Sequence, residues 1–463
     1  MAINIERINS KLEGEFYFRG KKWSVPFTVT GDAVQFKLKR RGRKFSMEVL
    51  HIEKDEKSRE NLPLIEPVCP VFASCGGCRA QHLDYAFQLK LKTDPVISAM
   101  ENKFNILPEI IPAAALKGHR HRMDFTVDGI SVGFRPAGDF SKIVDTETCP
   151  VQSEKANQTL KIFRETLKQF PGIGYRREDL TGSVKYATIR WGISGALILT
   201  CDETNFSKEE NSKMMGEFTD FLIKKIKTEF NDSLSLILCM SSEGSEISCT
   251  PGGRSIYGRD FFSIEIGETE FNVPYDSFFQ PNPKCFNGLI EWSTERLIRN
   301  SEMIESGELL DLYSGSGILS SLFAGTLERK IGNKFEQITG YDFIMSSVAN
   351  AESNFKNITA DVEFIAADLN QKFKEGNNPF INKNISLIIA DPPRAGLSPS
   401  LVKNIAEHSK APLFLYISCN PESQVRDLEM LGESYTVSDA CIADCFPHTG
   451  HLEQAVLLKR KNT

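Results

Sequence analysis

The sequence contains no continuous apolar run of about 18 residues, the length at which a helix can cross a bilayer. Its first residues, Met1–Arg7, lack a basic segment followed by an apolar one, so they do not indicate a secretory signal peptide. Internal repeats and low-complexity tracts are also absent. We therefore expect a cytoplasmic protein without a membrane partner, in which most of the 11 cysteines are reduced thiols.

Negative charge predominates overall, but it is unevenly distributed. The net charge is −6, whereas residues 1–61 carry 14 Lys or Arg against 9 Asp or Glu, which gives +5 there and −11 elsewhere. The positive charge is concentrated in six residues: Lys37, Lys39, Arg40, Arg41, Arg43 and Lys44. Such a cluster can bind phosphates by releasing counterions, although lysine-rich strand edges also prevent aggregation. Charge alone leaves both interpretations open.

The length of 463 residues exceeds what one compact core accommodates, so we expect a multidomain protein. Short alternating strands in residues 1–62 (14–19, 23–28, 33–39 and 45–52) predict a small OB-like β-barrel, a fold often used on nucleic acid. A proline-rich connector follows, and mixed strands and helices predict an α+β middle domain over residues 63–266.

Residues 267–463 follow a βαβ pattern. Buried parallel strands appear as continuous apolar runs, and seven strands are predicted at residues 309–313, 338–342, 362–368, 385–391, 413–419, 435–443 and 452–460. The last two form an expected hairpin. This pattern predicts a C-terminal α/β domain of the Rossmann-like methyltransferase type.

A glycine-rich turn containing Gly315 and Gly317 follows the first of these strands and opens a helix, as in folds that bind a nucleoside cofactor. Three aspartates close later strands. Asp342 could accept the ribose hydroxyls, and Asp368 would lie beside the adenine. The third is Asp391. Each aspartate alone could be a helix cap, but three at equivalent strand ends favour an S-adenosylmethionine site.

The turn Asp391-Pro392-Pro393-Arg394 fixes its backbone through two prolines, so the Asp391 carboxylate is held in one direction. Enzymes that methylate exocyclic amines carry an aromatic residue after such a turn. Arg394 stands in that place here, which argues against amine methylation.

Cys419 lies where a strand meets its loop, and Asn420-Pro421 breaks the strand, which would expose the sulfur. A buried structural cysteine is the alternative. A thiolate that adds to C6 of a pyrimidine makes C5 nucleophilic, and a base must then remove the C5 proton. Glu453 is the predicted base, with His448 and His451 as rivals. These residues predict C5 methylation of a pyrimidine through a covalent adduct.

In their order, Asp391–Arg394, Ser418–Pro421 and Phe446–Glu453 resemble the motifs of the RNA uracil-C5 methyltransferases. The resemblance implies an RNA substrate, Cys419 as nucleophile and Glu453 as proton acceptor. It also implies cofactor contacts at Gln280, Tyr313, Asp342 and Asp391. Asp342 stands where relatives commonly carry glutamate, and Ile318 where some carry asparagine. The N-terminal barrel resembles a TRAM domain.

Three closely spaced cysteines and a distant fourth form a candidate metal site: Cys69, Cys75, Cys78 and Cys149. Zinc and an iron–sulfur cluster both fit four thiolates, although a zinc ribbon would carry a second C-x2-C pair. The C-x3-C-x2-C signature of radical enzymes is absent. The family resemblance implies a [4Fe–4S] cluster.

These features together predict a monomer that methylates C5 of a uridine in structured RNA, with Arg120 and Arg122 on phosphates. Ribosomal RNA is favoured over transfer RNA, because the related transfer-RNA enzymes of many bacteria lack the barrel and the cluster. An RNA cytosine-C5 methyltransferase is disfavoured, since Asp391-Pro392 replaces its second catalytic cysteine motif. A catalytically silent RNA-binding or folding chaperone is the remaining alternative.

Overall fold

The computed structural model describes residues 2–41, 44–139, 141–304, 306–332, 335–355, 358–369, 378–381 and 383–461, without the side chains of Arg41 and Lys44. The chain forms two compact units. The first comprises Met1–Ser98, Phe134–Val144 and Phe446–His451, and the second comprises Ala99–Gly133, Asp145–Cys445 and Leu452–Thr463. None of the described helices is both long enough and apolar enough to traverse a bilayer.

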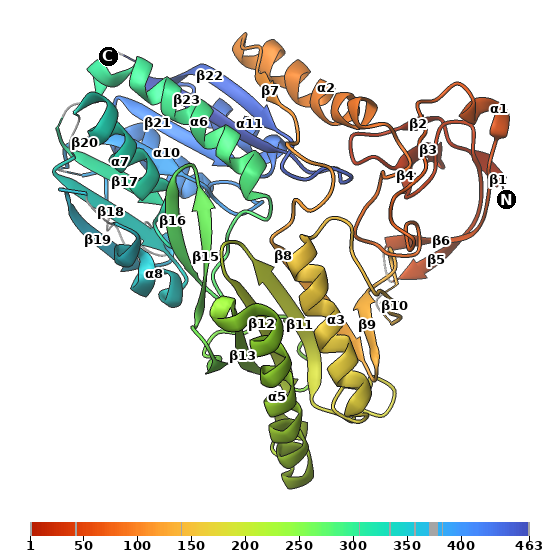
Figure 1. Ribbon diagram of the computed structural model, residues 1–463. Helices are drawn as coiled ribbons and strands as arrows, with labels where there is room; N and C mark the ends of the chain where they lie inside the picture. The colour runs from red at the N-terminus through yellow and green to blue at the C-terminus, as the bar shows by residue number, and fades with distance from the viewer. Residues whose placement is uncertain are drawn as a thin grey trace. The chain divides into compact units, whose positions relative to one another are not determined.

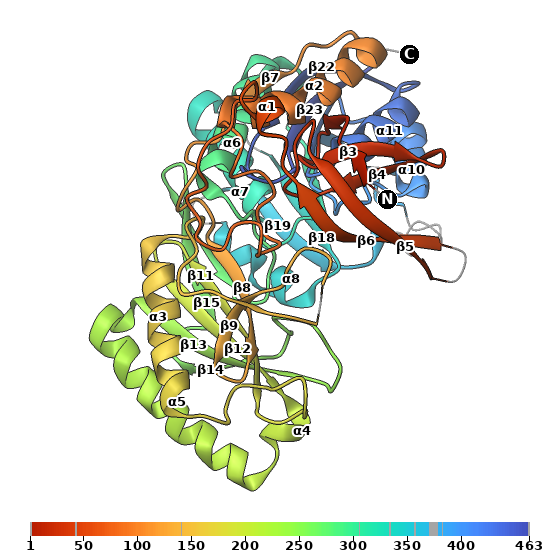
Figure 2. The ribbon, with the colours of Figure 1, turned by 90° about the vertical axis from the view of Figure 1, so that its right-hand side faces the viewer.

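The first unit begins with two three-stranded antiparallel sheets (Figure 2). One sheet has the order β1-β5-β6, formed by Ala2–Asn4, Ala33–Arg41 and Lys44–Glu53; the other has the order β2-β3-β4, formed by Arg7–Ile8, Gly14–Phe18 and Lys21–Val25. Two helices follow, α1 (Glu56–Arg59) and α2 (Tyr85–Phe104), and the second unit takes the end of α2. The predicted alternating strands are thus present.

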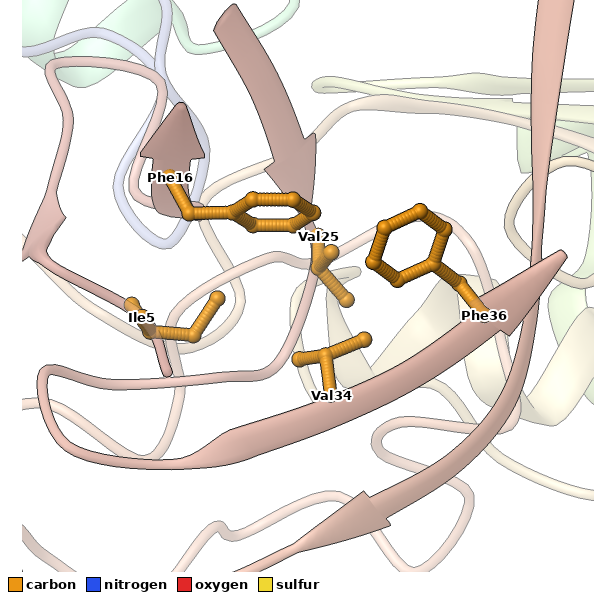
Figure 3. Close-up of a cluster of buried hydrophobic side chains, with 5 residues drawn as sticks. All are labelled: Ile5, Phe16, Val25, Val34 and Phe36. Atoms are coloured by element: carbon orange, nitrogen blue, oxygen red, sulfur yellow. The ribbon is translucent and has the colours of Figure 1, made fainter. Parts of the chain in front are cut away.

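One core serves both small sheets. Figure 3 shows the buried side chains of Ile5, Phe16, Val25, Val34 and Phe36 directed toward one another, and the rings of Phe16 and Phe36 lie 5.3 Å apart. Val34 and Phe36 are buried while Gln35 and Lys37 of the same strand are exposed, the period of two expected of a half-buried strand. Full burial of each large apolar side chain stabilises the fold by about 1.5–3 kcal/mol.

Most of the second unit's centre is a sheet that has seven strands in the described part of the chain, in the order β10-β9-β8-β11-β12-β13-β14; only Phe134 of β9 and Val144 of β10 are assigned to the first unit. Its strands are β8 (Arg122–Asp128), β9 (Ser131–Phe134), β10 (Val144–Asp145), β11 (Val184–Trp191), β12 (Gly195–Asp202), β13 (Leu234–Ser241) and β14 (Arg254–Tyr257). Helices α3 (Glu154–Gln169) and α5 (Glu209–Phe230) pack on each other and on this sheet, and α4 (Glu203–Phe206) is one short turn. Every residue of β11 and β12 is buried.

A hairpin of β15 (Phe261–Ile266) and β16 (Thr269–Pro274) leads to the cofactor sheet, which has eight strands among the described residues. Its order is β19-β18-β17-β20-β21-β23-β22-β7, with β17 (Glu308–Leu312), β18 (Gln337–Asp342), β19 (Asp361–Ala366), β20 (Ile385–Ala390), β21 (Leu413–Ser418), β22 (Tyr435–Ala443), β23 (Glu453–Arg460) and β7 (Glu109–Ile111). The first five are parallel to one another, and β23 is antiparallel to both β21 and β22. The seven-stranded α/β prediction is confirmed.

The eighth strand, β7, was not predicted. It pairs in parallel with β22 and comes from the sequence region assigned to the middle domain. Three residues are too few for a periodic pattern to be recognised. In Figure 1, α6 (Pro283–Arg299) and α7 (Ile318–Ile331) lie on one face of this sheet and α10 (Pro399–His408) and α11 (Pro421–Leu431) on the other; α8 (Met345–Ala351) connects β18 to β19.

All residues of β17, β20 and β21 are buried, which explains why the sequence shows continuous apolar runs there. Because the carboxyl ends of parallel strands meet at one edge of the sheet, the residues that follow these strands come together. The candidate site is built at this edge.

Candidate active site

Cys419 and Glu453 continue the ladder of two neighbouring antiparallel strands. Ser418, the last residue of β21, pairs with Gln454 of β23, so the next position outward brings Cys419 opposite Glu453. Cys419 is half-buried, whereas Glu453 is 0% exposed. Asn420 and Pro421 end the strand, and Pro421 is the first residue of α11.

The Cys419 thiol is surrounded by charges of both signs. Burial, and then the carboxylates of Glu453 and Asp391, raise its pKa to about 11. The Arg394 guanidinium, which is hydrogen-bonded to the thiol, lowers this pKa. The structure therefore places a cation where it stabilises a thiolate.

The Glu453 side chain is completely buried. Burial raises its pKa well above the usual range, and the negative charge of Asp391 adds to that rise. Both carboxylate oxygens are buried without a hydrogen-bond partner among the described residues. A carboxylate in this condition is a strong base that lacks internal partners.

Asp391 follows β20, and burial raises its pKa to about 7. Gln280, from the segment between β16 and α6, donates a hydrogen bond from Nε2 to Asp391 Oδ2 over 3.2 Å. Gln280 is 4% exposed, and its Oε1 has no partner within the part of the chain that the structure describes. One unused acceptor therefore lies beside Asp391.

The glycine-rich turn is held by Asp342. Its Oδ2 accepts from the Gly315 N–H (2.9 Å) and its Oδ1 from the Ile344 N–H (2.8 Å). Each oxygen retains a lone pair for another donor. Gly317 has φ +69°, and a Cβ there would lie 2.7 Å from Phe364 Cζ, so the turn requires glycine on two grounds.

Asp368 lies two residues beyond the end of β19 and does not close the strand as predicted. It is nevertheless close to Tyr313: burial and then the Asp368 charge raise the Tyr313 pKa to about 12. After β18, the side chains of Phe343 and Met345 are 75% and 76% exposed. The edge of the sheet thus offers carboxylates, backbone amides and apolar side chains together.

Comparisons with known proteins decide the family. A family model described as tRNA (Uracil-5-)-methyltransferase matches residues 254–461. An uncharacterized RNA methyltransferase of Leptospira interrogans is 34% identical over 467 aligned residues, which cover 99% of this chain and 96% of the relative. The chain belongs to the RNA uracil-C5 methyltransferase family. It is accordingly an S-adenosylmethionine-dependent enzyme.

Similarity extends along the whole methyltransferase. The tRNA (uracil(54)-C(5))-methyltransferase of Pyrococcus abyssi is 27% identical, covering 93% of this chain and 94% of that protein. The crystal structure of the P. abyssi enzyme in complex with S-adenosyl-L-homocysteine superimposes with a TM-score of 0.71 at 24% identity, covering 99% of this chain and 100% of that one. The two proteins share a fold from end to end.

Two residues of the methyltransferase site were not predicted as functional candidates from the sequence. From the sequence, Arg394 was interpreted only as the residue that replaces an aromatic side chain. The spacing of residues in the sequence does not reveal that the Arg394 side chain lies near Cys419. Asp311 is 0% exposed, and burial, with smaller contributions from Asp391 and Asp342, raises its pKa to about 7. The available signal was an aspartate in the last two positions of a buried strand, just before the turn that contains Gly315 and Gly317.

The rival bases His448 and His451 belong to the first unit. The His448 N–H donates to Gln88 Oε1 (3.0 Å), and its ring nitrogen Nδ1 lies 3.4 Å from Gln88 Nε2. The His448 carbonyl accepts from the Arg79 N–H over 2.7 Å. These contacts give His448 a clear local role within its own unit.

The predicted RNA contacts in the first unit lie on a solvent-facing strand. Lys37, Lys39 and Arg40 are exposed on β5, and Lys39 pairs with Glu48 over 3.0 Å. Arg43 lies outside the described residues, as do the side chains of Arg41 and Lys44.

In the second unit, the Arg122 guanidinium forms a fork with both carboxylate oxygens of Asp124, at 2.9–3.2 Å. The Arg120 side chain is partly buried, and its backbone N–H donates to the Val151 carbonyl. Arg122 is therefore already ion-paired, and neither residue presents a fully exposed cation.

Three of the predicted cluster ligands, Cys69, Cys75 and Cys78, lie in the first unit, and Cys149 lies in the second. Gln81 accepts from the Cys69 N–H (3.0 Å) and donates to Cys78 Sγ (3.3 Å). Among the described residues, however, no three His, Cys, Asp or Glu side chains are arranged to hold a metal ion. The four-cysteine site therefore remains a prediction from the sequence.

Proposed function

We propose that this methyltransferase adds the Cys419 thiolate to C6 of a target uridine and methylates C5 of the resulting enolate. The observation that carries the proposal is the placement of Cys419 opposite Glu453 on neighbouring strands, with Arg394 hydrogen-bonded to the thiol. A nucleophile, a base and a cation that favours the thiolate are the groups that this chemistry requires.

The reaction begins when the half-buried Cys419 thiol releases its proton to solvent water and its sulfur forms a bond to C6, while the C5–C6 π electrons pass to the enolate at C4–O4. Bound S-adenosylmethionine would supply the methyl group that C5 captures, and S-adenosylhomocysteine would leave with the electron pair of the broken C–S bond. Glu453 then removes the remaining C5 proton, the C5=C6 double bond re-forms, and the sulfur leaves C6 with the bonding pair. The buried, unpartnered carboxylate of Glu453 has the raised basicity suited to this proton removal.

For the cofactor, we propose that the turn at Gly315 and Gly317 approaches the nucleoside and that Asp342 accepts the ribose hydroxyls. Asp368 and the exposed Phe343 would border the adenine. A second group, Gln280, Tyr313 and Asp391, would contact the remainder of the cofactor. The free lone pairs of Asp342 and the unused Gln280 Oε1 support these assignments.

Two substitutions test the chemistry. Cys419→Ala should abolish both methyl transfer and RNA–protein adducts, and wild-type enzyme should be trapped by RNA with 5-fluorouridine at the target, because fluorine cannot leave as a cation. Glu453→Gln should accumulate a methylated covalent complex, visible as a shifted band on a denaturing gel. Trapping by Cys419→Ala would assign the nucleophile elsewhere. Normal turnover by Glu453→Gln would move the base to His448, His451 or water.

We further propose that residues 1–62 form a TRAM-like RNA-binding barrel ahead of a middle domain (63–266) and a catalytic domain (267–463). Exposed rings on the first unit lie next to cations: Lys22 Nζ is 5.9 Å from the Tyr17 ring, and Lys21 Nζ is 5.9 Å from the Phe45 ring. Tyr17 is 52% and Phe45 47% exposed. Exposed aromatic and basic side chains together suit single-stranded RNA.

Ribosomal RNA is the proposed substrate, in line with the presence of the N-terminal sheets. Transfer RNA is a second candidate, because the P. abyssi tRNA (uracil(54)-C(5))-methyltransferase aligns with 93% of this chain in sequence and 99% in structure. Mapping of 5-methyluridine in both RNAs from a deletion strain separates them. Absence of the modification at one ribosomal position supports the first candidate, and its absence at tRNA position 54 supports the second.

We also propose, from the cysteine spacing, a [4Fe–4S] cluster on Cys69, Cys75, Cys78 and Cys149. It is supported by the amides directed at two of these sulfurs: the Gln81 side chain at Cys78, and the Gly77 N–H at Cys75 over 3.4 Å. Anaerobically purified protein should contain about four iron and four sulfide per chain. Cys149→Ser should lose both, and stoichiometric zinc or iron-free native protein would refute the cluster.

A further inference from the structure

The segment Ser277–Asn282, which carries Gln280, is hydrogen-bonded to two different sheets of the second unit. Toward the cofactor sheet its side chains make four contacts: Ser277 Oγ with Ser316 Oγ (3.1 Å) and Ser347 Oγ (2.7 Å), Gln280 Nε2 with Asp391 Oδ2 (3.2 Å), and Asn282 Nδ2 with the Cys445 carbonyl (3.1 Å). These contacts place Gln280 beside Asp391.

Toward the central sheet, the segment and the residues before it are held through their backbone carbonyls. Arg190 of β11 donates from Nη2 to the Ser277 carbonyl (2.6 Å) and from Nη1 to the Pro274 carbonyl (3.3 Å). The His121 N–H donates to the Pro281 carbonyl over 2.9 Å. The carbonyls bound by Arg190 and His121 lie on either side of Gln280 in the chain.

Arg190 is an unusual residue to find at this position. It is 0% exposed and the largest of the fully buried side chains, and its guanidinium carbon lies 5.0 Å from the centre of the Phe262 ring. Among the described residues it forms no direct ion pair, although the carboxylates of Asp124 and Asp276 act on its charge from farther away, and its Nε has no hydrogen-bond partner. Burial of a charge without a carboxylate in contact is costly, and both of its hydrogen bonds are made to the carbonyls before Gln280.

We propose that Arg190 is a positioning residue for methyl transfer: it fixes the Pro274 and Ser277 carbonyls and thereby holds Gln280 against Asp391. Arg190 does not touch the reacting atoms. It acts from the central sheet on a segment whose other face belongs to the cofactor sheet. The alternative is that Arg190 only stabilises the interior, in which case its replacement would lower stability without a specific effect on turnover.

The first test compares Arg190→Met with Arg164→Met. Arg164 is a second buried arginine of the same unit, 6% exposed, bonded to Asp145 and the Val132 carbonyl, away from this segment. Both variants should melt at lower temperature. At a temperature where near-ultraviolet circular dichroism shows both folded, Arg190→Met should lower kcat by roughly 10- to 100-fold, because small displacements in a site have effects of that order. Arg164→Met should retain a kcat close to that of wild type.

The second test asks whether Arg190 acts through Gln280. Methyl transfer is measured with RNA purified from cells that lack the gene, for Gln280→Ala and for the double variant. If Arg190 positions Gln280, adding Arg190→Met to Gln280→Ala changes kcat by less than about threefold, since the two effects are not additive. Full additivity, or an unchanged kcat in Arg190→Met, would overturn the proposal. If Arg190→Met fails to fold, Arg190→Lys replaces it in the same comparison of single and double variants. Lysine keeps the positive charge and one donor nitrogen, so this variant should lose less activity.

Discussion

At the scale of single residues, the reactivity of Cys419 depends on opposing charges. Two carboxylates and burial raise its pKa to about 11, and Arg394 works against them. Arg394→Gln should therefore raise the thiol pKa further, shift the pH profile of iodoacetamide alkylation to higher pH, and slow alkylation at pH 8 by roughly tenfold per pKa unit. Methyl transfer should fall in parallel.

Arg299→Gln is a suitable control for the Arg394 variant. Arg299 is an exposed arginine of α6 whose side chain is paired with Glu295. Its replacement should leave the alkylation profile of Cys419 unchanged. An identical profile in Arg394→Gln and wild type would show that the guanidinium does not act on the thiol.

Asp311 gives a second prediction, on stability. Its folded pKa is about 7 against an ordinary value of 3.8, so the folded state binds a proton that the unfolded state releases between these pH values. Its contribution to stability is present below pH 4 and disappears as the pH rises through 7. Asp311→Asn should thus gain stability over wild type between pH 5 and pH 8, by on the order of a few kcal/mol in urea unfolding. Asp361→Asn, at an exposed position, should not gain stability over wild type in this pH range. If the free energy of unfolding of Asp311→Asn depended on pH as that of wild type does, the raised pKa of Asp311 would be contradicted.

At the scale of elements, the two ends of α7 offer a matched comparison. Gly317 and Gly332 flank the helix, and both have φ +69°, but a Cβ at Gly317 would press on Phe364 and Phe355, whereas at Gly332 it would meet nothing within 4 Å. Gly332→Ala should cost only the backbone strain, about 1 kcal/mol. Gly317→Ala should cost a further ~1–3 kcal/mol and weaken S-adenosylmethionine binding in calorimetry. Equal effects would mean that the turn adapts to the extra methyl group.

The elements also show what a sequence can reveal. Strand β22 matches the predicted residues 435–443, since it is a long run of apolar and alternating residues between clear breaks. The meeting of Cys419 and Asp391 follows from the rule that parallel strands end at one edge, and Glu453 joins them because it begins the antiparallel strand β23 beside β21. The hydrogen bond between Gln280 and Asp391 spans 111 positions, and the direction of the Arg394 side chain is set by packing. Neither the hydrogen bond nor the side-chain direction can be predicted from the spacing of residues in the sequence.

At the scale of the whole molecule, a net charge of −6 opposes binding to a polyanion, so any affinity for RNA must come from local surfaces. Replacing Lys37, Lys39 and Arg40 by glutamine should weaken RNA binding and flatten its salt dependence, by about 0.7–0.9 in log–log slope for each phosphate that is no longer neutralised. Turnover at saturating RNA should change little. Replacing Lys213 and Lys224, exposed lysines of α5, provides the control. Unchanged affinity and slope in the β5 variant would make this stretch a solvated strand edge.

The pairing of β7 with β22 limits how the chain can be divided. Glu109–Ile111 covers the outer side of Cys441–Ala443, so a fragment that begins at residue 254, where the family match begins, would leave this outer edge of β22 unpaired. Unpaired strand edges recruit other chains. Such a fragment should elute as aggregates in size-exclusion chromatography, and a synthetic peptide of residues 105–113 added during refolding should restore monomers by filling the vacant edge. A minimal catalytic version of this enzyme would thus need two pieces of chain that lie about 140 residues apart in the gene product.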